Sequence, residues 1–281
     1  MKLLYLLIIM LLTLGSTSEG TVDNKPDAEI VLTGIKGEIY DSLSKEVPGP
    51  LFKELFKDPL FQIYEIRQKS ESYQAVTVDY FKSPRFGLFT PAGKRAGTNF
   101  LEKYSEYLGR AVQRFELDQE AIPVISAMAG MEYSWGNLNP THKIFNSLVS
   151  VYHNNPGRKA FVLQNINGLL QAMEHPDINI DPFAPSSFMG AAGYCQLMPF
   201  WFTTIIEHDK IHLLDLDNSG KFNPYSMPDA IAFFAWRLDE GGFNRDQRTA
   251  IRRYIGSGTT ADSYVTAVLD FAQEISNKQL N

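Results

Sequence analysis

One carboxylate of this chain is expected among apolar side chains near the end of a helix. The eleven residues Ala121–Met131 carry no charge, and helical steps back from Glu132 reach Ala129, Met128 and Ile125. Hydrocarbon surroundings disfavour an ionised carboxylate, so we expect a raised pKa for Glu132. An acid that keeps its proton near neutral pH can protonate the leaving oxygen of a glycosidic bond. The alternative is a core glutamate that is hydrogen-bonded to a polar neighbour.

Two aromatic residues flank this carboxylate. Tyr133 and Trp135 offer flat surfaces on which a sugar ring can stack, and Gly136 is a suitable helix stop.

A later segment, residues 253–258, is by itself typical of a glycine turn between two helices.

A further segment combines small residues with polar side chains. Within residues 187–199, small residues occupy positions 190–193, and Tyr194 and Gln196 follow among apolar neighbours. Small residues let the backbone approach another group closely. The alternative is a tight contact between two helices.

The elements that position these residues are predicted to be mainly helical. Residues 21–98 are interpreted as a flexible leader and an N-terminal extension that wraps the main domain. The extension is expected to hold a short helix over residues 51–56 and an extended segment over residues 72–78. Later helices are expected over residues 100–112, 118–136, 142–152, 159–174, 200–207, 227–240 and 263–276.

The N-terminus has the pattern of a secretory signal peptide, which we assign to residues 1–20. Met1 and Lys2 precede an apolar run from Leu3 to Leu14, and small residues follow. The run is shorter than the ~20 apolar residues that span a bilayer; a retained N-terminal anchor is the alternative. The mature protein is therefore expected in the periplasm or outside the cell, without a membrane span.

Cysteine content and net charge exclude an internal disulfide and some classes of binding partner. Cys195 is the single cysteine of the chain, so an intramolecular disulfide is excluded. The net charge of −6 and the lack of a long basic run argue against a nucleic-acid binder. Contacts to a polymeric substrate must then be local, and a monomer is expected.

Taken together, these segments resemble the lytic murein transglycosylase B family. Met131–Gly136 is similar to the family's V-E-T-R-W-G, and Ser187–Pro199 is similar to S-F-A-G-A-M-G-Y-G-Q-F-M-P. Residues 150–158 are similar to a segment that ends in N-Y-P-R-R, and residues 228–231 resemble part of D-P-V-D-A-I. The resemblance covers residues 78–243 in sequence order, with a shorter match in the late glycine segment.

The resemblance implies a lysozyme-like (SLT-type) catalytic domain, which we assign to residues 99–281, with a cleft for the glycan strands of peptidoglycan. It implies that Glu132 is the catalytic residue and that no cofactor is required. By the same resemblance, the substrate-binding residues are Ser187, Tyr194, Gln196, Met198, Tyr254, Arg158 and Tyr133.

The chain departs from the family pattern at several positions. Cys195 and Gly157 replace a glycine and the first arginine of a pair, respectively, and Ile255 stands where the family has asparagine. The last change removes one polar group expected near the reacting sugar. Phe243 and Tyr254 are only eleven residues apart, so a long insertion of the family is nearly absent and a more open cleft is expected on that side.

The mechanism implied by the resemblance needs one carboxylate. Glu132 protonates the oxygen between N-acetylmuramic acid (MurNAc) and N-acetylglucosamine (GlcNAc), and the acetamido carbonyl of MurNAc attacks its own anomeric carbon. Glu132 then takes the proton of the C6 hydroxyl, and 1,6-anhydro-MurNAc forms. Ser187 and Gln196 are expected to orient the acetamido group. The alternatives are a muramidase-type hydrolase, which admits water, and a non-catalytic peptidoglycan-binding protein.

A loop near residue 220 fits the beginning of an EF-hand. Residues 215–223 place oxygens at the first, third and fifth positions and a glycine at the sixth. The position-twelve residue is a serine, and Asp229 is three residues further on. A polar turn without an ion is the alternative. The predicted calcium ligands are Asp215, Asp217, Ser219, Lys221 and Ser226.

Overall fold

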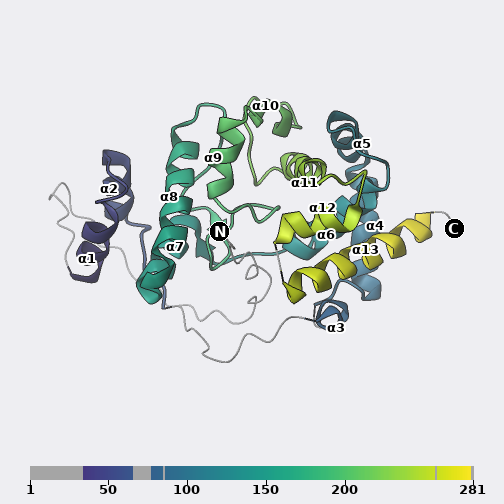
Figure 1. The fold of residues 1–281 in the computed structure, drawn as a ribbon, viewed down its shortest axis with the longest axis horizontal. Coiled ribbons are helices and arrows are strands. Elements are labelled where there is room, and N and C mark those ends of the chain that lie inside the picture. The colour runs from purple at the N-terminus through teal and green to yellow at the C-terminus, as the bar shows by residue number, and fades with distance from the viewer. Residues whose placement is uncertain (1–33, 66–76, 85, 257, 280–281) are drawn as a thin grey trace.

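The computed structural model describes residues 34–65, 77–84, 86–256 and 258–279 (Figure 1). The predicted signal peptide lies outside these residues, as do residues 72–76 of the predicted extended segment. The described chain is mainly helical, as expected. Its elements are α1 (Gly34–Leu43), α2 (Pro50–Lys57), α3 (Val78–Lys82), α4 (Pro91–Lys103), α5 (Ser105–Arg114), α6 (Ala121–Tyr133), the 3-10 helix η1 (Ser134–Gly136), β1 (His142–Lys143), α7 (Ile144–Asn154), the 3-10 helix η2 (Pro156–Arg158), α8 (Lys159–Glu174), β2 (Pro185–Ser186), α9 (Phe200–Glu207), α10 (Ile211–Leu214), α11 (Met227–Gly241), α12 (Gln247–Ile255) and α13 (Thr259–Gln279).

Helix α6 lies inside the larger of two apolar clusters. Its residues from Val124 to Tyr133 are all buried, and it packs against α4, α5, α11 and α13. A helix that is apolar on all sides is expected in such an interior position. The packing therefore carries Glu132, the only charged residue of α6, into the interior of the molecule.

The second apolar cluster joins the N-terminal helices to α7 and α8. Figure 1 shows α1 and α2 at one end of the molecule, close to α7 and α8. Phe52, Phe56 and Phe61 surround the ring of Phe145 on α7, with ring centroids 5.4–6.1 Å away. The same cluster includes Met189, so this end of the molecule supports the segment 187–199.

A minimal sheet fixes the segment 187–199 against the start of α7. Strands β1 and β2 pair antiparallel, with His142 opposite Ser186. Ala192 then forms single bridges with Ser186 and with Leu197. These pairings fold the segment back on itself and hold its small residues next to α7.

Tyr104 interrupts the helix that was expected over residues 100–112. Helix α4 ends at Lys103 and α5 begins at Ser105, with Tyr104 at φ −109° and ψ 18° between them. Its ring packs against Phe100 at a centroid distance of 4.9 Å. The four-residue period continues across the break, which is why the apolar pattern alone predicted one helix.

Other expectations differ in detail. Val78, the last residue of the expected extended segment, begins α3, and α3 ends before Pro84, as the restriction on residues preceding proline favours. His142 and Lys143 form β1 instead of starting a helix. Helix α4 begins at Pro91 and crosses residues 98 and 99, where the extension was expected to end. The helices expected over residues 51–56, 159–174, 200–207, 227–240 and 263–276 correspond to α2, α8, α9, α11 and α13.

Candidate active site

Two residues in the left-handed region of the backbone set the end of α6. Ser134 has φ 48° and Trp135 has φ 55°, so the chain leaves the helix directly after Tyr133. The indole Nε1 of Trp135 donates to the carbonyl of Ser126 at 2.9 Å. The ring lies so close to α6 that a Cβ at Gly130 would be 2.5 Å from it. Trp135, whose ring was expected to offer a surface to a sugar, is partly buried and anchors the end of α6.

Glu132 is a buried acid with one hydrogen-bond partner from the C-terminal helix. It is 6% exposed, and the hydroxyl of Tyr264 on α13 donates to its Oε1 at 2.6 Å. Burial raises the pKa of Glu132 to about 7, and the Tyr264 hydrogen bond acts in the opposite direction. The raised pKa expected from the sequence is confirmed, and its main cause is desolvation.

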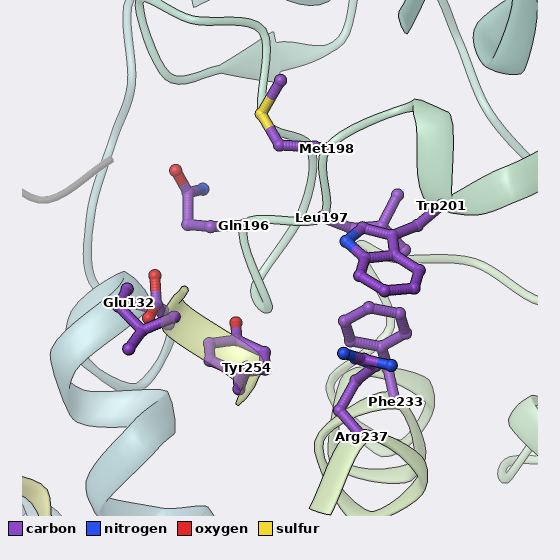
Figure 2. Close-up of a pocket in the computed structure, with 9 residues that line it drawn as sticks. Glu132, Gln196, Leu197, Met198, Trp201, Phe233, Arg237 and Tyr254 are labelled. Atoms are coloured by element: carbon purple, nitrogen blue, oxygen red, sulfur yellow. The ribbon is translucent and has the colours of Figure 1, made fainter. Parts of the chain in front are cut away.

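A pocket adjoins Glu132 and gathers residues from four helices and one loop (Figure 2). Among the residues predicted from sequence, it brings together Glu132, Gln196, Met198 and Tyr254. Helices α9, α11 and α12 supply other walls. The lining residues are Glu132, Gln196, Leu197, Met198, Trp201, Phe233, Arg237, Tyr254 and Ile255.

Gln196 and Tyr254 are held by backbone groups of the segment 187–199. Gln196 has φ 48°, and its Nε2 donates to the carbonyl of Gly193 at 3.0 Å, which commits one end of the amide. The hydroxyl of Tyr254 on α12 donates to the carbonyl of Cys195 at 2.8 Å. The side-chain Oε1 of Gln196 is therefore the amide atom available to accept a hydrogen bond from a ligand.

Tyr133 and Tyr194 lie next to each other beside this pocket. Their rings meet edge to face, with centroids 5.2 Å apart. Tyr194 follows Gly193, which has φ +70° and approaches Pro224 so closely that a Cβ would lie 2.1 Å from the Pro224 carbonyl oxygen. The close approach of backbone that the small residues predicted is thus an approach to the chain's own Pro224.

Ser187 and Arg158 are not among the residues that line the pocket. The Oγ of Ser187 accepts hydrogen bonds from the amides of Met189 and Ala191, at 3.3 and 3.0 Å. Its own hydroxyl hydrogen stays available as a donor. Arg158, at the end of η2, places Nη1 at 3.9 Å from the sulfur of Met189.

Sequence reasoning assigned no role to four residues that the structure places at this site. Tyr264 contacts the carboxyl group of Glu132, and Trp201, Phe233 and Arg237 line the pocket. An arginine directly after the apolar run 230–236 could have indicated a functional residue. A buried charge is costly unless a partner compensates it, so such a residue stands out in an apolar run. The position of Tyr264 had no such local signal.

The acidic loop gathers three carboxylates. Single carboxylate oxygens of Asp215, Asp217 and Asp229 lie within 4.8 Å of one another. Asp229 is buried and accepts the amides of Leu216 and Asn223, both at 2.9 Å. Burial raises the pKa of Asp229 to about 7.

The remaining predicted ligands of the loop bond to one another. The Ser226 hydroxyl donates to Asp217 at 2.6 Å, and the Ser219 hydroxyl donates to the Lys221 carbonyl at 3.0 Å. It also lies 3.3 Å from a carboxylate oxygen of Asp215. These oxygens converge, which fits a hard cation such as Ca²⁺. Asp229, three residues after Ser226, supplies the third carboxylate of the cluster.

Comparison with known proteins gives concordant matches. Residues 41–275 match the family model described as the transglycosylase SLT domain. The membrane-bound lytic murein transglycosylase B of Escherichia coli (strain K12) is 27% identical over 164 residues, which are 58% of this chain and 42% of that protein. The chain thus spans less than half the length of this curated relative.

Solved structures share the fold. The soluble lytic transglycosylase SltB1 from Pseudomonas aeruginosa superposes with a TM-score of 0.66 at 17% identity, over 88% of this chain and 99% of that one. The Escherichia coli lytic transglycosylase Slt35, solved in complex with calcium, superposes with a TM-score of 0.65 at 18% identity, over 88% and 94%. The predicted SLT-type, lysozyme-like fold is confirmed.

Within the ranges that the structure describes, every helix is too short or too polar to cross a membrane.

Proposed function

The chain belongs to the transglycosylase SLT domain family, and we propose that it is a lytic transglycosylase that cleaves the β-1,4 bond between MurNAc and GlcNAc in peptidoglycan with formation of 1,6-anhydro-MurNAc. The observation that carries the proposal is the buried Glu132, whose pKa is raised to about 7 and which borders the pocket. The name of the curated relative, a lytic murein transglycosylase, supports murein as the substrate.

The first step is protonation of the glycosidic oxygen. Tyr264 donates to Oε1 of Glu132, so the acidic proton belongs on Oε2. With a pKa of about 7, Glu132 holds that proton in a large fraction of molecules near neutral pH. As the bond to the leaving GlcNAc breaks, Glu132 transfers the proton and becomes a carboxylate.

The second step uses a nucleophile from the substrate. Ordinary retaining and inverting glycosidases need a second carboxylate, ~5–5.5 Å or ~6.5–9.5 Å from the first. Glu132 is the single acidic residue among the described residues that line the pocket. The acetamido carbonyl of MurNAc therefore attacks the anomeric carbon, and an oxazolinium ion forms. Because this nucleophile is intramolecular, it gains the advantage of proximity.

The third step closes the anhydro ring. The carboxylate of Glu132 accepts the proton of the C6 hydroxyl, whose oxygen attacks the anomeric carbon and displaces the acetamido oxygen. Glu132 ends protonated, ready for the next strand, and no water is consumed. The apolar surroundings of Glu132, including Ile255 and Leu197 in the pocket wall, favour this outcome because they limit access of water.

Two polar groups are proposed to orient the acetamido group. The free Oε1 of Gln196 accepts its N–H, and the hydroxyl hydrogen of Ser187 remains available to donate. Met198, Tyr254, Tyr133, Tyr194 and Arg158 are proposed to contact the neighbouring parts of the glycan strand.

The decisive experiment replaces the acid. Glu132→Gln keeps the size of the side chain and can still accept from Tyr264, but it has no proton of suitable acidity. We expect purified sacculi digested by wild-type protein to release anhydromuropeptides, detected by mass spectrometry, and the E132Q variant to release essentially none. An exposed-site variant, Glu106→Gln, is the matched control (Glu106 side chain 79% exposed).

The same digest separates the alternatives. Products heavier by one water than the anhydro forms would identify a hydrolase. Wild-type protein that binds sacculi without releasing products would identify a non-catalytic binding protein. Wild-type levels of anhydro products from E132Q would overturn the assignment of Glu132.

The acidic loop is proposed to bind one Ca²⁺, held by Asp215, Asp217, Ser219, the Lys221 carbonyl and Asp229. Such an ion would link the loop to the first turn of α11 and compensate the charge of three neighbouring carboxylates. We expect the melting temperature to rise in millimolar Ca²⁺ relative to chelator, and Asp217→Asn to abolish the rise. Asp209→Asn, at a 95% exposed side chain outside the cluster, is the control. An equal melting temperature in Ca²⁺ and chelator would exclude the ion.

We also propose that the protein is exported from the cytoplasm. The apolar N-terminal run supports a signal peptide over residues 1–20, and the murein substrate lies in the cell envelope. N-terminal sequencing of the protein recovered from its native host would find the cleavage, or find the segment retained as an anchor.

A further inference from the structure

The pocket beside Glu132 has a second, cationic end. Figure 2 shows Glu132 on one side and Trp201, Phe233 and Arg237 on the other, with Tyr254 between them. Phe233 and Arg237 are four residues apart on α11 and therefore share one face of that helix. None of these three residues takes part in the steps described above.

Arg237 is held in a fixed and largely dry position. Its guanidinium carbon lies 3.9 Å from the centroid of the Trp201 ring and 5.5 Å from that of Trp236. The residue is 8% exposed. A guanidinium stacked on an aromatic face keeps its N–H donors in its own plane, where they can form a bidentate pair with a carboxylate. Low solvent exposure strengthens such a pair.

The charge of Arg237 reaches Tyr254, which lies between the two ends of the pocket. It lowers the pKa of Tyr254 against the larger effect of burial. The pKa of Glu132 responds to burial and to Tyr264. The positive charge of Arg237 at this end of the pocket can attract an anionic part of the strand.

A peptidoglycan strand offers few anionic groups near its sugar rings. GlcNAc is neutral. MurNAc carries a lactyl group, which ends in a free carboxylate where the strand has no stem peptide and in an amide where a stem is attached. Stem peptides bring further carboxylates, at a greater distance from the ring.

Resting on the proposed function, we propose that Arg237, stacked on Trp201, forms a subsite that binds a carboxylate carried by a muramyl residue of the strand. The subsite makes the protein select strands by the charge of the muramyl substituent. The lactyl carboxylate of a strand without stems and a carboxylate of the stem itself are the two possible sources of this group.

The test measures binding without turnover, in the E132Q background, to three soluble strand preparations. The first is freed of stems by an amidase and carries lactyl carboxylates. The second is the same material with those carboxylates reduced to alcohols. The third keeps its stems. We expect E132Q to bind the first preparation about tenfold more tightly than the second, as one charge-assisted bidentate pair would give.

Arg237→Met removes the charge and keeps an unbranched apolar chain. In the E132Q/R237M protein we expect the affinity ratio between the first two preparations to fall to about one. E132Q/R95M, which removes an exposed arginine of α4 outside the pocket, should keep the tenfold ratio. Should R237M not fold, Arg237→Lys retains a charge without the planar fork, and a reduced ratio is expected.

The third preparation identifies the source of the carboxylate. Weak binding of stem-bearing strands assigns the subsite to the free lactyl group. Tight binding that is lost in R237M assigns it to a carboxylate of the stem. The proposal is overturned if the E132Q protein binds the three preparations equally, or if its preference survives in both Arg237 variants.

This result is independent of the proposed reaction. Anhydro products from wild-type protein together with no preference in binding would leave the lytic activity standing and reject the subsite. A binding preference that depends on Arg237, in a protein that releases no anhydro products, would support the subsite and reject the lytic activity.

Discussion

At the scale of single residues, the proposed chemistry depends on a contact between two side chains far apart in sequence. Glu132 and Tyr264 are separated by 132 positions, yet the phenol hydroxyl lies 2.6 Å from the carboxyl oxygen. Burial favours the protonated acid, and the phenol favours the carboxylate. An acid that must first release and then regain a proton needs both influences, because a pKa far from the working pH would slow one of the two transfers.

Removal of the Tyr264 hydroxyl should change the pH profile of the reaction. In Tyr264→Phe the lowering influence is lost while burial remains, so the pKa of Glu132 rises. The free enzyme must carry the proton on Glu132, so kcat/KM falls as pH rises through the pKa of Glu132. In Y264F, the alkaline limb of the pH profile of kcat/KM should therefore move to higher pH. The measurement is kcat/KM for anhydromuropeptide release across pH. Tyr107→Phe, on α5, should leave the limb in place, and an unmoved limb in Y264F would contradict the role of Tyr264.

At the scale of elements, the segment 187–199 reaches its position because one glycine packs against the loop before α11. Gly193 has φ +70°, and a Cβ there would lie 2.1 Å from the Pro224 carbonyl oxygen. Tyr194, next in the chain, donates its amide to the same carbonyl at 2.9 Å. This contact sets where Gln196 stands relative to Glu132.

Gly193→Ala should therefore displace the segment and lower activity. Both the positive φ and the clash oppose a methyl group, and we expect ~1–3 kcal/mol of destabilisation together with a large loss of kcat. Gly220→Ala is the informative control, because Gly220 has φ +87° with no atom within 4 Å of the added carbon. Urea unfolding and sacculus digestion would measure the two effects. Equal outcomes for the two variants would show that the contact with Pro224 has no part in positioning the site.

The helices could be predicted from the sequence to the extent that their signals are local. The helical spacing of apolar residues predicted α8, α9 and α11. The uncharged run 121–131 predicted that Glu132 is buried. The break at Tyr104 left the period unchanged and was missed. The pairings of Tyr264 with Glu132 and of Arg237 with Trp201 depend on how helices cross, and one sequence carries no record of that.

At the scale of the whole molecule, the buried acid opposes stability at neutral pH. Glu132 has a pKa of about 7 in the folded protein against 4.5 as its ordinary value. The folded state therefore binds more protons than the unfolded state between these values. Its contribution to stability is fully present below pH 4.5 and is lost as pH rises through about 7.

Glu132→Gln should then stabilise the protein in a pH-dependent way. The uncharged amide avoids burial of a carboxylate, so the gain should be small at pH 4.5 and reach at most ~3 kcal/mol at pH 8. The free energy of unfolding in urea at both pH values is the measurement, with the exposed-site variant Glu106→Gln as control. A gain of the same size at both pH values would refute the raised pKa.

The one thiol of the chain has a practical consequence. Cys195 is fully buried between Tyr194 and Gln196, and burial raises its pKa. A maleimide or iodoacetamide dye should find no target in the native protein, since neither access nor thiolate is available. Any labelling would report opening of the segment 187–199, in which the carbonyl of Cys195 separates from the hydroxyl of Tyr254. The rate of labelling of the unmodified wild-type chain would therefore measure how often this segment opens.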